Sequence, residues 1–224
     1  MNNKSLLKLL CILLFLIADN SYAQQKDPYT PEIQVFKKQD SISFPPKNAI
    51  LLIGSSSFTR WKDVQSYFPG YKIINRGFGG STLPDVIKHF NDVVMPYSPK
   101  QILIYCGEND LASSDAITVP IVVARFKELY GMIRKGLGNN VNVTYVSMKP
   151  SPSRRRLMPK YTEANALIKA YLAKEKNTGF IDVYKPMLAS DGQPIKDIFV
   201  ADSLHMKANG YAIWQKVIQP YLLK

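Results

Sequence analysis

Five short apolar runs recur along the 224-residue chain, and segments with helical spacing of apolar residues separate most of them. Runs of five to seven residues have the length of strands, whereas helices usually need about ten residues or more. The five runs are Ala49–Gly54, Tyr71–Asn75, Gln101–Gly107, Asn142–Met148 and Gly179–Val183. Alternation of strands and helices favours a parallel sheet that is covered by helices on both faces.

Three apolar stripes at helical spacing lie between these runs. Pro84, Pro120 and Pro159 fall near the starts of the corresponding segments, where a helix tolerates proline. We therefore expect an α/β protein of three layers, α/β/α, with a five-stranded parallel sheet in flavodoxin-like order. The stripes are Val86, Phe90 and Val93; Val122, Phe126, Leu129, Tyr130 and Ile133; and Ala164, Leu167, Ile168, Tyr171 and Leu172.

The first 23 residues have the pattern of a secretory signal peptide. Lys4 and Lys8 precede the apolar run Leu9–Ala18, and the small residues of Ser21-Tyr22-Ala23 suit cleavage after Ala23. The apolar run is shorter than the roughly 20 residues that span a bilayer, so we expect no stable membrane anchor. The residues before Cys11 are not the small ones that precede a lipidated cysteine. The sequence thus predicts export to the periplasm or the exterior.

The remaining chain is expected to form one domain. Residues 24–46 are a lead-in without a clear strand, and residues 47–224 contain all five apolar runs. Cys106 is the only cysteine after residue 23, so no disulfide within the domain is possible. Its position on an apolar run predicts a small buried side chain.

The charge balance is strongly basic. The whole chain carries +12, and residues 24–224 keep +11 once Lys4, Lys8 and Asp19 are removed. Such a charge suits anionic glycans, lipopolysaccharide, a membrane surface or nucleic acid. The one basic cluster, Arg154–Arg156, stands among prolines and is expected to be a solvated loop or to recognise an anionic group.

Unusual loops follow the first three apolar runs. They read GSSS from Gly54, NRGFGGST from Asn75 and GEND from Gly107. Ligands of open parallel sheets bind beyond the carboxyl ends of the strands, where these loops would converge. Each loop alone has a structural explanation, since the glycines suit a tight turn and Asn109-Asp110 suits a helix cap.

The chain has two histidines, so a base for a serine nucleophile has few candidates. His205 stands three residues after Asp202, a spacing that lets the carboxylate fold back onto the imidazole Nδ1. Helix capping produces the same spacing, so the pair alone is a weak signal. His89 lies beside an apolar helical stripe, and we expect it to be a partly exposed surface residue.

Together, GSSS, GFGGST, GEND and DSLH resemble the four sequence blocks of the SGNH hydrolases, also called GDSL-type esterases and lipases. The resemblance covers nearly the whole chain after residue 23. The sequence is similar to a secreted bacterial branch of this family. It implies the SGNH-hydrolase fold, with Ser56 as nucleophile and with Asp202 and His205 completing a triad. It also implies an oxyanion hole of the Ser56 and Gly80 backbone N–H groups and the Asn109 side chain. No metal or organic cofactor is implied.

Two departures from the family pattern bear on these assignments. Ser55 and Ser57 stand where the family has an acidic residue and a leucine, so three hydroxyls compete for the nucleophile. Ser56 is preferred because the family places the nucleophile two residues after the glycine. Gly79 is an alternative oxyanion donor, and Gly80 is preferred because it directly precedes the Ser-Thr pair. The chain has no Gly-x-Ser-x-Gly motif, which argues against the α/β-hydrolase nucleophile elbow.

The sequence therefore predicts a serine esterase that cleaves a small-molecule or glycan ester, such as a sugar O-acetyl or short-chain acyl ester. Two alternatives stay open: an O-acyltransferase, and a catalytically silent polysaccharide-binding module on the same fold. A nucleic-acid partner is not expected, because no known binding motif is visible. The acyl chain, the alcohol and the oligomeric state are not specified by the sequence.

Overall fold

The computed structural model describes residues 27–224, so the predicted signal peptide lies outside the described residues. Residues Pro31–Lys224 form one compact unit, which contains the sheet and the predicted site. Within residues 27–224, no helix has the length and apolar character needed to span a membrane.

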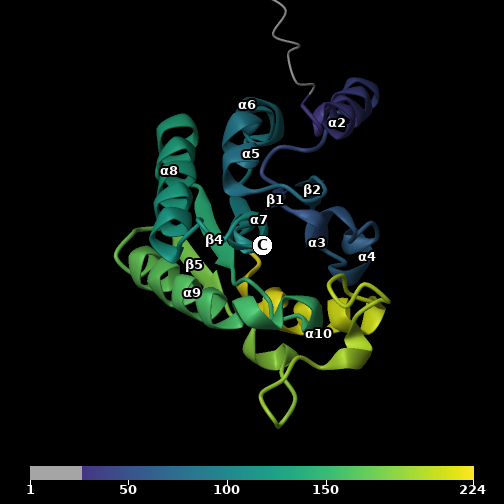
Figure 1. Ribbon diagram of the computed structural model, residues 1–224. Helices are drawn as coiled ribbons and strands as arrows, with labels where there is room; N and C mark the ends of the chain where they lie inside the picture. Colours follow the sequence, from purple (N-terminus) through teal and green to yellow (C-terminus); the bar gives the residue numbers. More distant parts are fainter. Residues whose placement is uncertain (1–26) are drawn as a thin grey trace, which may run out of the picture. The chain divides into compact units, whose positions relative to one another are not determined.

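The sheet has five parallel strands in the order β2-β1-β3-β4-β5, as predicted. The register aligns Gly54, at the end of the first strand, with both Gly77 and Tyr105. Three strand ends therefore lie side by side at one edge, which faces the viewer in Figure 1. The strands are β1 (Ile50–Gly54), β2 (Ile73–Gly77), β3 (Gln101–Tyr105), β4 (Asn142–Val146) and β5 (Thr178–Ile181).

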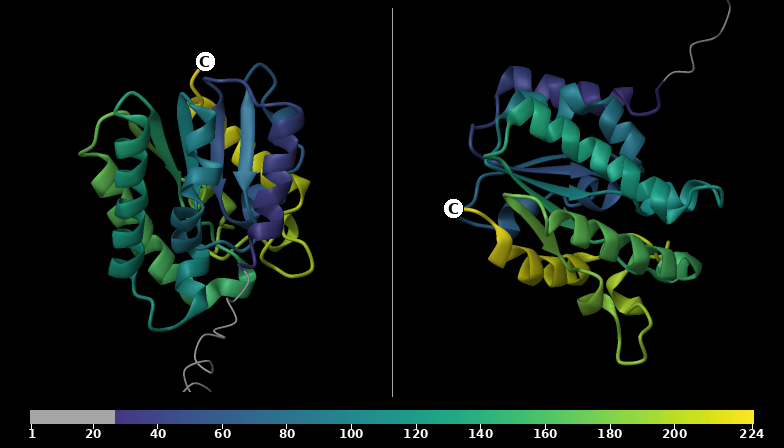
Figure 2. Two further views of the ribbon diagram at one scale, coloured as in Figure 1. Left: turned by 90° about the horizontal axis from the view of Figure 1, so that it is seen from above. Right: turned by 90° about the vertical axis from the view of Figure 1, so that its left-hand side faces the viewer.

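Helices cover both faces of this sheet. Figure 2 shows α2, α5, α6 and α8 on one side of the strands and α9 and α10 on the other. The predicted three-layer arrangement is thus confirmed. The α-helices are α2 (Thr30–Ile42), α3 (Ser56–Thr59), α4 (Val64–Tyr67), α5 (Leu83–Lys88), α6 (Phe90–Val93), α7 (Glu108–Ser113), α8 (Val119–Leu137), α9 (Met158–Leu172) and α10 (Ala208–Ile218). Short 3-10 helices are η1 (Met95–Tyr97), η2 (Pro152–Leu157), η3 (Lys185–Met187), η4 (Lys196–Ile198) and η5 (Gln219–Tyr221).

The three predicted stripes differ in how well they match the helices. All five residues of the second stripe are buried on α8, as predicted. The first stripe does not form one helix, because the chain breaks at His89 between α5 and α6. In the third stripe Leu167 is 44% exposed, and Tyr161 and Asn165 contribute to the buried face of α9 instead.

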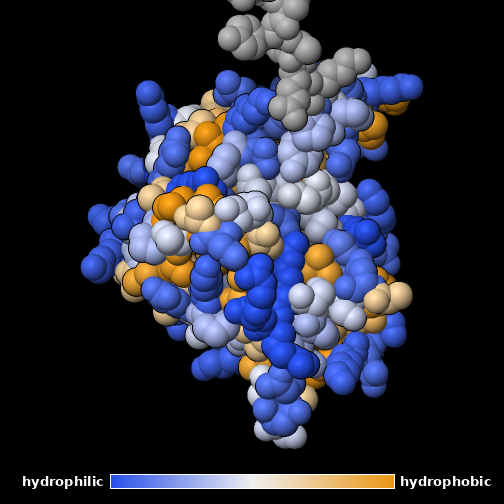
Figure 3. Space-filling model, in the orientation of Figure 1, coloured by the Kyte–Doolittle hydropathy of each residue, from blue (hydrophilic) through white to orange (hydrophobic). Residues whose placement is uncertain are grey.

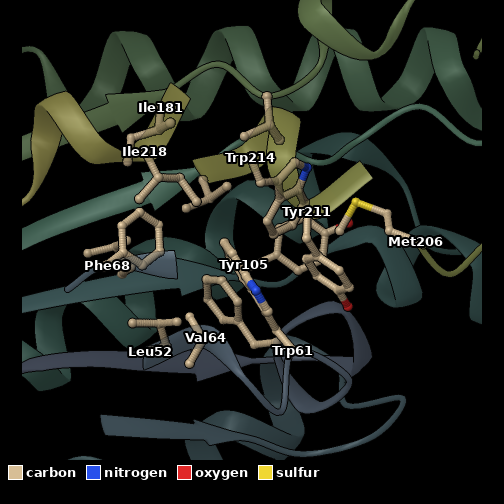
Figure 4. Close-up of a cluster of buried hydrophobic side chains, with 14 of the residues drawn as sticks. Leu52, Trp61, Val64, Phe68, Tyr105, Ile181, Met206, Tyr211, Trp214 and Ile218 are labelled. Atoms are coloured by element: carbon tan, nitrogen blue, oxygen red, sulfur yellow. The ribbon is translucent and has the colours of Figure 1, made fainter. Parts of the chain in front are cut away.

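An aromatic cluster fills the space between the sheet and α10 (Figure 4). Trp61 stacks on Tyr211 at a centroid distance of 4.8 Å and meets Trp214 edge to face at 6.1 Å. The hydroxyl of Tyr211 donates to the carbonyl of Ser57 at 2.8 Å. The core thereby attaches α10 directly to the turn that follows β1.

The lead-in contains helix α2, which the sequence did not predict. Only Ile33 of this helix is buried, so its apolar period is too weak to detect. Polar contacts attach it to the sheet instead: Asp40 accepts from Arg76 at the end of β2 and, at 2.6 Å, from the Tyr97 hydroxyl. The Arg76 guanidinium also lies over the Phe36 ring.

Candidate active site

The chain leaves β1 through a glycine that no other residue could replace. Gly54 has a φ of +124°, and a Cβ there would lie 1.9 Å from the carbonyl oxygen of Tyr105. Helix α3 begins two residues later at Ser56. The sharp exit brings the three serines to the carboxyl edge of the sheet, as the loop positions predicted.

Burial separates the three serines. Ser55 and Ser57 are 3% and 2% exposed, whereas Ser56 is partly exposed. The Ser56 hydroxyl oxygen lies 2.8 Å from Nε2 of His205. Of the triplet, only Ser56 thus combines access from solvent with a histidine contact.

His205 is held on its other side by Asp202. Its Nδ1 lies 2.6 Å from Oδ2 of Asp202, while the backbone N–H groups of Leu204 and His205 donate to Oδ1, both at 2.9 Å. The structure therefore brings Ser56, His205 and Asp202 into one hydrogen-bonded series, although 149 residues separate the serine from the histidine.

These contacts also set the charge of Asp202. The partial burial of Asp202 acts to raise its pKa, but the hydrogen bonds from His205 and Leu204 outweigh it and hold the pKa well below the usual range. Asp202 is consequently ionised at neutral pH.

A short antiparallel contact presents His205. Phe199 and Met206 form an isolated bridge, and the N–H of Val200 donates to the carbonyl of His205 at 2.8 Å. Met206 packs in the aromatic cluster below. The loop between η4 and α10 is thereby closed at its base, with His205 at its inner end.

The loop after β2 distinguishes its two candidate glycines. The N–H of Gly79 lies 3.1 Å from both carboxylate oxygens of Glu32 on α2. Gly80 has a φ of +76°, and within residues 27–224 its N–H has no acceptor. The same is true of the Ser56 N–H. Gly80 therefore keeps a free backbone donor, whereas Gly79 does not.

Asn109 is on the first turn of α7, which begins directly after the GEND glycine. Its Nδ2 donates to the carbonyl of Ser81 at 3.1 Å, which leaves the second hydrogen of the amide available. The next residue, Asp110, accepts the N–H of Leu83 at 2.9 Å and so fixes the start of α5. Both contacts hold the GEND loop against the glycine loop.

An open cleft of about 270 Å³ joins these groups. Figure 3 shows a strongly hydrophilic band across the middle of this face. The open cleft is lined by Ser56, Thr59, Arg60, Gly79, Gly80, Asn109, Arg154, Leu204 and His205.

A second hollow, of about 180 Å³, is lined by α9 and the segment from β5 to Lys185. It contains none of the predicted residues.

The structure changes the interpretation of two other residues and agrees with a third. Arg154 is not in a solvated loop, because it lies on η2, lines the cleft and approaches buried Glu108 at 3.4 Å. His89 was predicted to be partly exposed, but it is only 8% exposed and packs edge to face on Phe78. Cys106 is buried as expected, and burial raises the pKa of its thiol.

Sequence reasoning missed the groups that support the cleft from behind. Glu32 is in the lead-in, and Lys149, which contacts both oxygens of Glu108 at 3.2 and 3.1 Å, follows β4. The available signal was a lysine that closely follows the buried strand β4. Within residues 27–224, no cluster of three or more His, Cys, Asp or Glu side chains could hold a metal ion.

A serine, a histidine and an aspartate in hydrogen-bonded series at the carboxyl edge of a parallel sheet form an arrangement that is typical of serine hydrolases. Residues 40–213 match the GDSL-like Lipase/Acylhydrolase family, and the chain belongs to this family. No curated protein gives a significant match to the chain.

Solved structures show the same fold at low sequence identity. A protein from Streptococcus pneumonia, proposed to be a platelet activating factor, is 19% identical with full coverage of both chains and a TM-score of 0.75. A proposed acylhydrolase from Bacteroides fragilis is 21% identical over 88% of this chain and 97% of its own, with a TM-score of 0.75. A catalytic mutant of an acetylxylan esterase from Geobacillus stearothermophilus is 13% identical over 78% and 94%, with a TM-score of 0.61.

Proposed function

We propose that this chain is a serine esterase in which Ser56 is the nucleophile, His205 the general base and Asp202 the residue that orients His205. The observation that carries the proposal is the series of contacts from Asp202 through His205 to Ser56, at 2.6 and 2.8 Å, which ends in an open cleft. Membership of an acylhydrolase family supports the same reading.

The proposed reaction has two steps, acylation of Ser56 and hydrolysis of the acyl-enzyme. Ser56 Oγ attacks the ester carbonyl while its proton moves to His205 Nε2, and the tetrahedral adduct then expels the alcohol, which takes that proton. Water enters the cleft, gives a proton to His205 and attacks the acyl-Ser56 carbonyl. Collapse of this second adduct releases the carboxylic acid and returns the proton to Ser56.

Each adduct carries negative charge on the former carbonyl oxygen. The N–H groups of Ser56 and Gly80 and the second amide hydrogen of Asn109 are the proposed donors to that oxygen. Their freedom from acceptors within residues 27–224 supports this role for the two backbone groups. A single donor of this kind typically lowers the barrier by about 3 kcal/mol.

The lining of the cleft favours a short acyl group. Among residues 27–224, Leu204 is the one aliphatic side chain that lines it, beside the methyl group of Thr59. A long acyl chain would remain in water along polar residues and gain little from burial. We therefore propose acetyl or similarly short esters, including sugar O-acetyl esters, as the substrate class. The fold shared with an acetylxylan esterase is compatible with this class.

Screening the purified protein against p-nitrophenyl esters of increasing chain length and against acetylated sugars tests the proposal. We expect turnover that is greatest for acetate esters and absent in Ser56→Ala. A silent binding module predicts no turnover, and a transferase predicts that an added sugar acceptor takes the acyl group in place of water. Turnover that rises steadily with chain length would contradict the short-acyl assignment.

We also propose that the protein is exported by its predicted signal peptide and belongs to a secreted bacterial branch of the family. The basic, apolar and small-residue pattern of residues 1–23 supports this. Sequencing the N-terminus of protein recovered from the periplasm or medium should give Gln24 as the first residue.

A further inference from the structure

Two arginines, Arg60 and Arg154, line the cleft. Among residues 27–224, no carboxylate is part of its lining. Three acidic residues contact groups in or behind the cleft. Asp202 contacts His205, Glu32 accepts from Gly79 and Glu108 pairs with Lys149. Two guanidinium groups therefore line the cleft, and these carboxylates are not among its lining residues.

Arg154 shares its carboxylate partner with a second, better-placed cation. Glu108 is buried and already has the Lys149 ammonium group within 3.2 Å of both carboxylate oxygens and the Tyr105 hydroxyl on one of them. Arg154 adds a second cation to the same carboxylate through one long contact of 3.4 Å. Arg154 is thus the more weakly held of the two cations, and most of its guanidinium donors remain available.

The position of Arg154 is nevertheless fixed. Its side chain is 19% exposed, and the Tyr161 hydroxyl interacts with it from the start of α9. A guanidinium that is oriented before a ligand binds loses little side-chain entropy on binding, and its planar donor array matches an oxyanion. Arg154 therefore differs from its exposed neighbours Arg155 and Arg156.

Arg60 approaches the cleft from the opposite segment, at the carboxyl end of α3. Its side chain is exposed, and within residues 27–224 it forms no ion pair with a carboxylate. Arg60 stands four residues after Ser56, and Arg154 is on η2. The two arginines thus come from separate elements. A ligand that fills the cleft meets both.

We propose that this esterase acts on esters whose alcohol portion carries an oxyanion group, a carboxylate or a phosphate, and that Arg154 with Arg60 binds that group. The inference rests on the proposed function and names its substrate class. A short acyl group leaves most of the cleft to the alcohol portion, so the anion belongs on that side of the ester.

Three O-acetylated sugars of similar shape test this proposal. They are the acetyl esters of methyl glucoside, methyl glucuronoside and methyl glucoside 6-phosphate. At low salt, kcat/KM should favour the better of the two anionic esters over the neutral one by about 10- to 100-fold, the range of a charge-assisted contact. The preference should shrink in 0.5 M NaCl. The relative rates on the two anionic esters distinguish carboxylate from phosphate.

Variants then locate the preference. Arg154→Gln should lower the anionic-to-neutral ratio about 10-fold, and the more exposed Arg60→Gln about threefold. The matched control Arg155→Gln removes the same charge outside the cleft and should leave the ratio unchanged. Because Arg60 is exposed and forms no ion pair with a carboxylate of the described residues, Arg60→Gln keeps the test informative if Arg154→Gln unfolds. An equal ratio in wild type and variants, or an equal loss in Arg155→Gln, overturns the proposal.

Failure of the proposed function gives a different result. If none of the three esters is cleaved, calorimetry with unacetylated methyl glucuronoside and methyl glucoside 6-phosphate still measures recognition of the anion. Binding that Arg154→Gln abolishes would support an anion site in a protein that is not an esterase. Absence of binding to both would overturn the anion site itself.

Discussion

Asp202 holds His205 through two different atoms of the same residue. One carboxylate oxygen lies 2.6 Å from the imidazole Nδ1, and the other accepts the His205 backbone N–H at 2.9 Å. The carboxylate thereby fixes both the ring and the turn that presents it. In the proposed mechanism this geometry assigns the Nδ1 proton and leaves Nε2 free to accept the proton of Ser56.

Asp202→Asn should lower kcat by about 10²- to 10⁴-fold with little change in KM, because an amide can donate to Nδ1, favour the wrong tautomer and withdraw the compensating charge. The lower end of that range applies if solvent compensates, since the Asp202 side chain is 43% exposed. Steady-state kinetics on an acetate ester measure the effect. Asp197→Asn, an exposed residue on η4, is the matched control and should retain wild-type rates.

The pH profile tests the base separately. The hydrogen bonds to Asp202 hold its pKa well below the usual 3.8, so it stays ionised throughout the neutral range. An acidic limb of kcat/KM between about pH 5 and 8 must then come from another group, and histidine is the side chain that ordinarily titrates there. The limb should be present in wild type and absent from the residual activity of His205→Ala. Its persistence in that variant would remove His205 from the role of base.

Ser56→Ala should abolish ester hydrolysis without unfolding the protein, because it removes the attacking oxygen at a partly exposed position. Ser55→Ala and Ser57→Ala should keep most of the activity, since both hydroxyls are buried away from His205. Activity and circular dichroism of the three purified variants measure this. Loss of activity in folded Ser55→Ala together with activity in Ser56→Ala would shift the nucleophile by one residue.

Asn109→Ala should lower kcat by about 10²- to 10³-fold with a smaller change in KM, because the proposed contact strengthens only when charge develops on the substrate oxygen. The side chain also donates to Ser81, so part of a larger loss would reflect movement of the glycine loop. Thermal unfolding of the variant separates the two effects. An unchanged kcat would exclude Asn109 from the oxyanion hole.

The sequence predicted the fold well because two local signals agreed: the short apolar runs and the helical stripes between them. Buried parallel strands are short apolar runs, and the observed strand bounds lie within two residues of the predicted ones. The match at β1 extends to the predicted turn, since the fully buried strand ends in Gly54, which has a positive φ. The single predicted helix after β2 was wrong at His89, whose non-helical backbone separates α5 from α6 although the apolar spacing continues across it.

The groups behind the cleft were not predictable for a related physical reason. Glu32, Glu108 and Arg154 act through contacts with residues 41 to 47 positions away, and no local pattern reports such partners. The same property hid α2, which polar contacts hold to the sheet. Family resemblance transferred the residues around the proposed chemistry but gave no information about these supports.

Glu32→Ala should lower kcat about 10-fold with little effect on KM, because it frees the Gly79 N–H and lets the neighbouring Gly80 donor move. Glu32→Gln keeps one carbonyl oxygen as acceptor and should restore most of the rate. Gln34→Ala, on the exposed side of α2, is the control. A purely structural role would lower the unfolding temperature in Glu32→Ala without the selective loss of kcat.

The buried pair of Glu108 and Lys149 gives a prediction about stability. Both residues are almost fully buried, at 3% and 1% exposed, and the ammonium group lies within 3.2 Å of both carboxylate oxygens. Glu108→Gln leaves a buried cation without a balancing charge and should reduce the free energy of unfolding by about 3–5 kcal/mol. Urea denaturation at pH 7 measures this, with Glu163→Gln on the exposed face of α9 as the control.

The pH dependence of that deficit identifies its cause. Burial lowers the pKa of Lys149 below its unfolded value, and Glu108 opposes the shift. Without Glu108 the folded-state pKa falls further, so between the folded and unfolded pKa values the unfolded chain binds more protons and stability rises with pH. The deficit of Glu108→Gln should therefore shrink between pH 7 and 10, and the double variant Glu108→Gln with Lys149→Met should recover most of it at pH 7. A deficit that is constant with pH and remains in the double variant would mean that lost packing, and not the unpaired ammonium group, destabilises the protein.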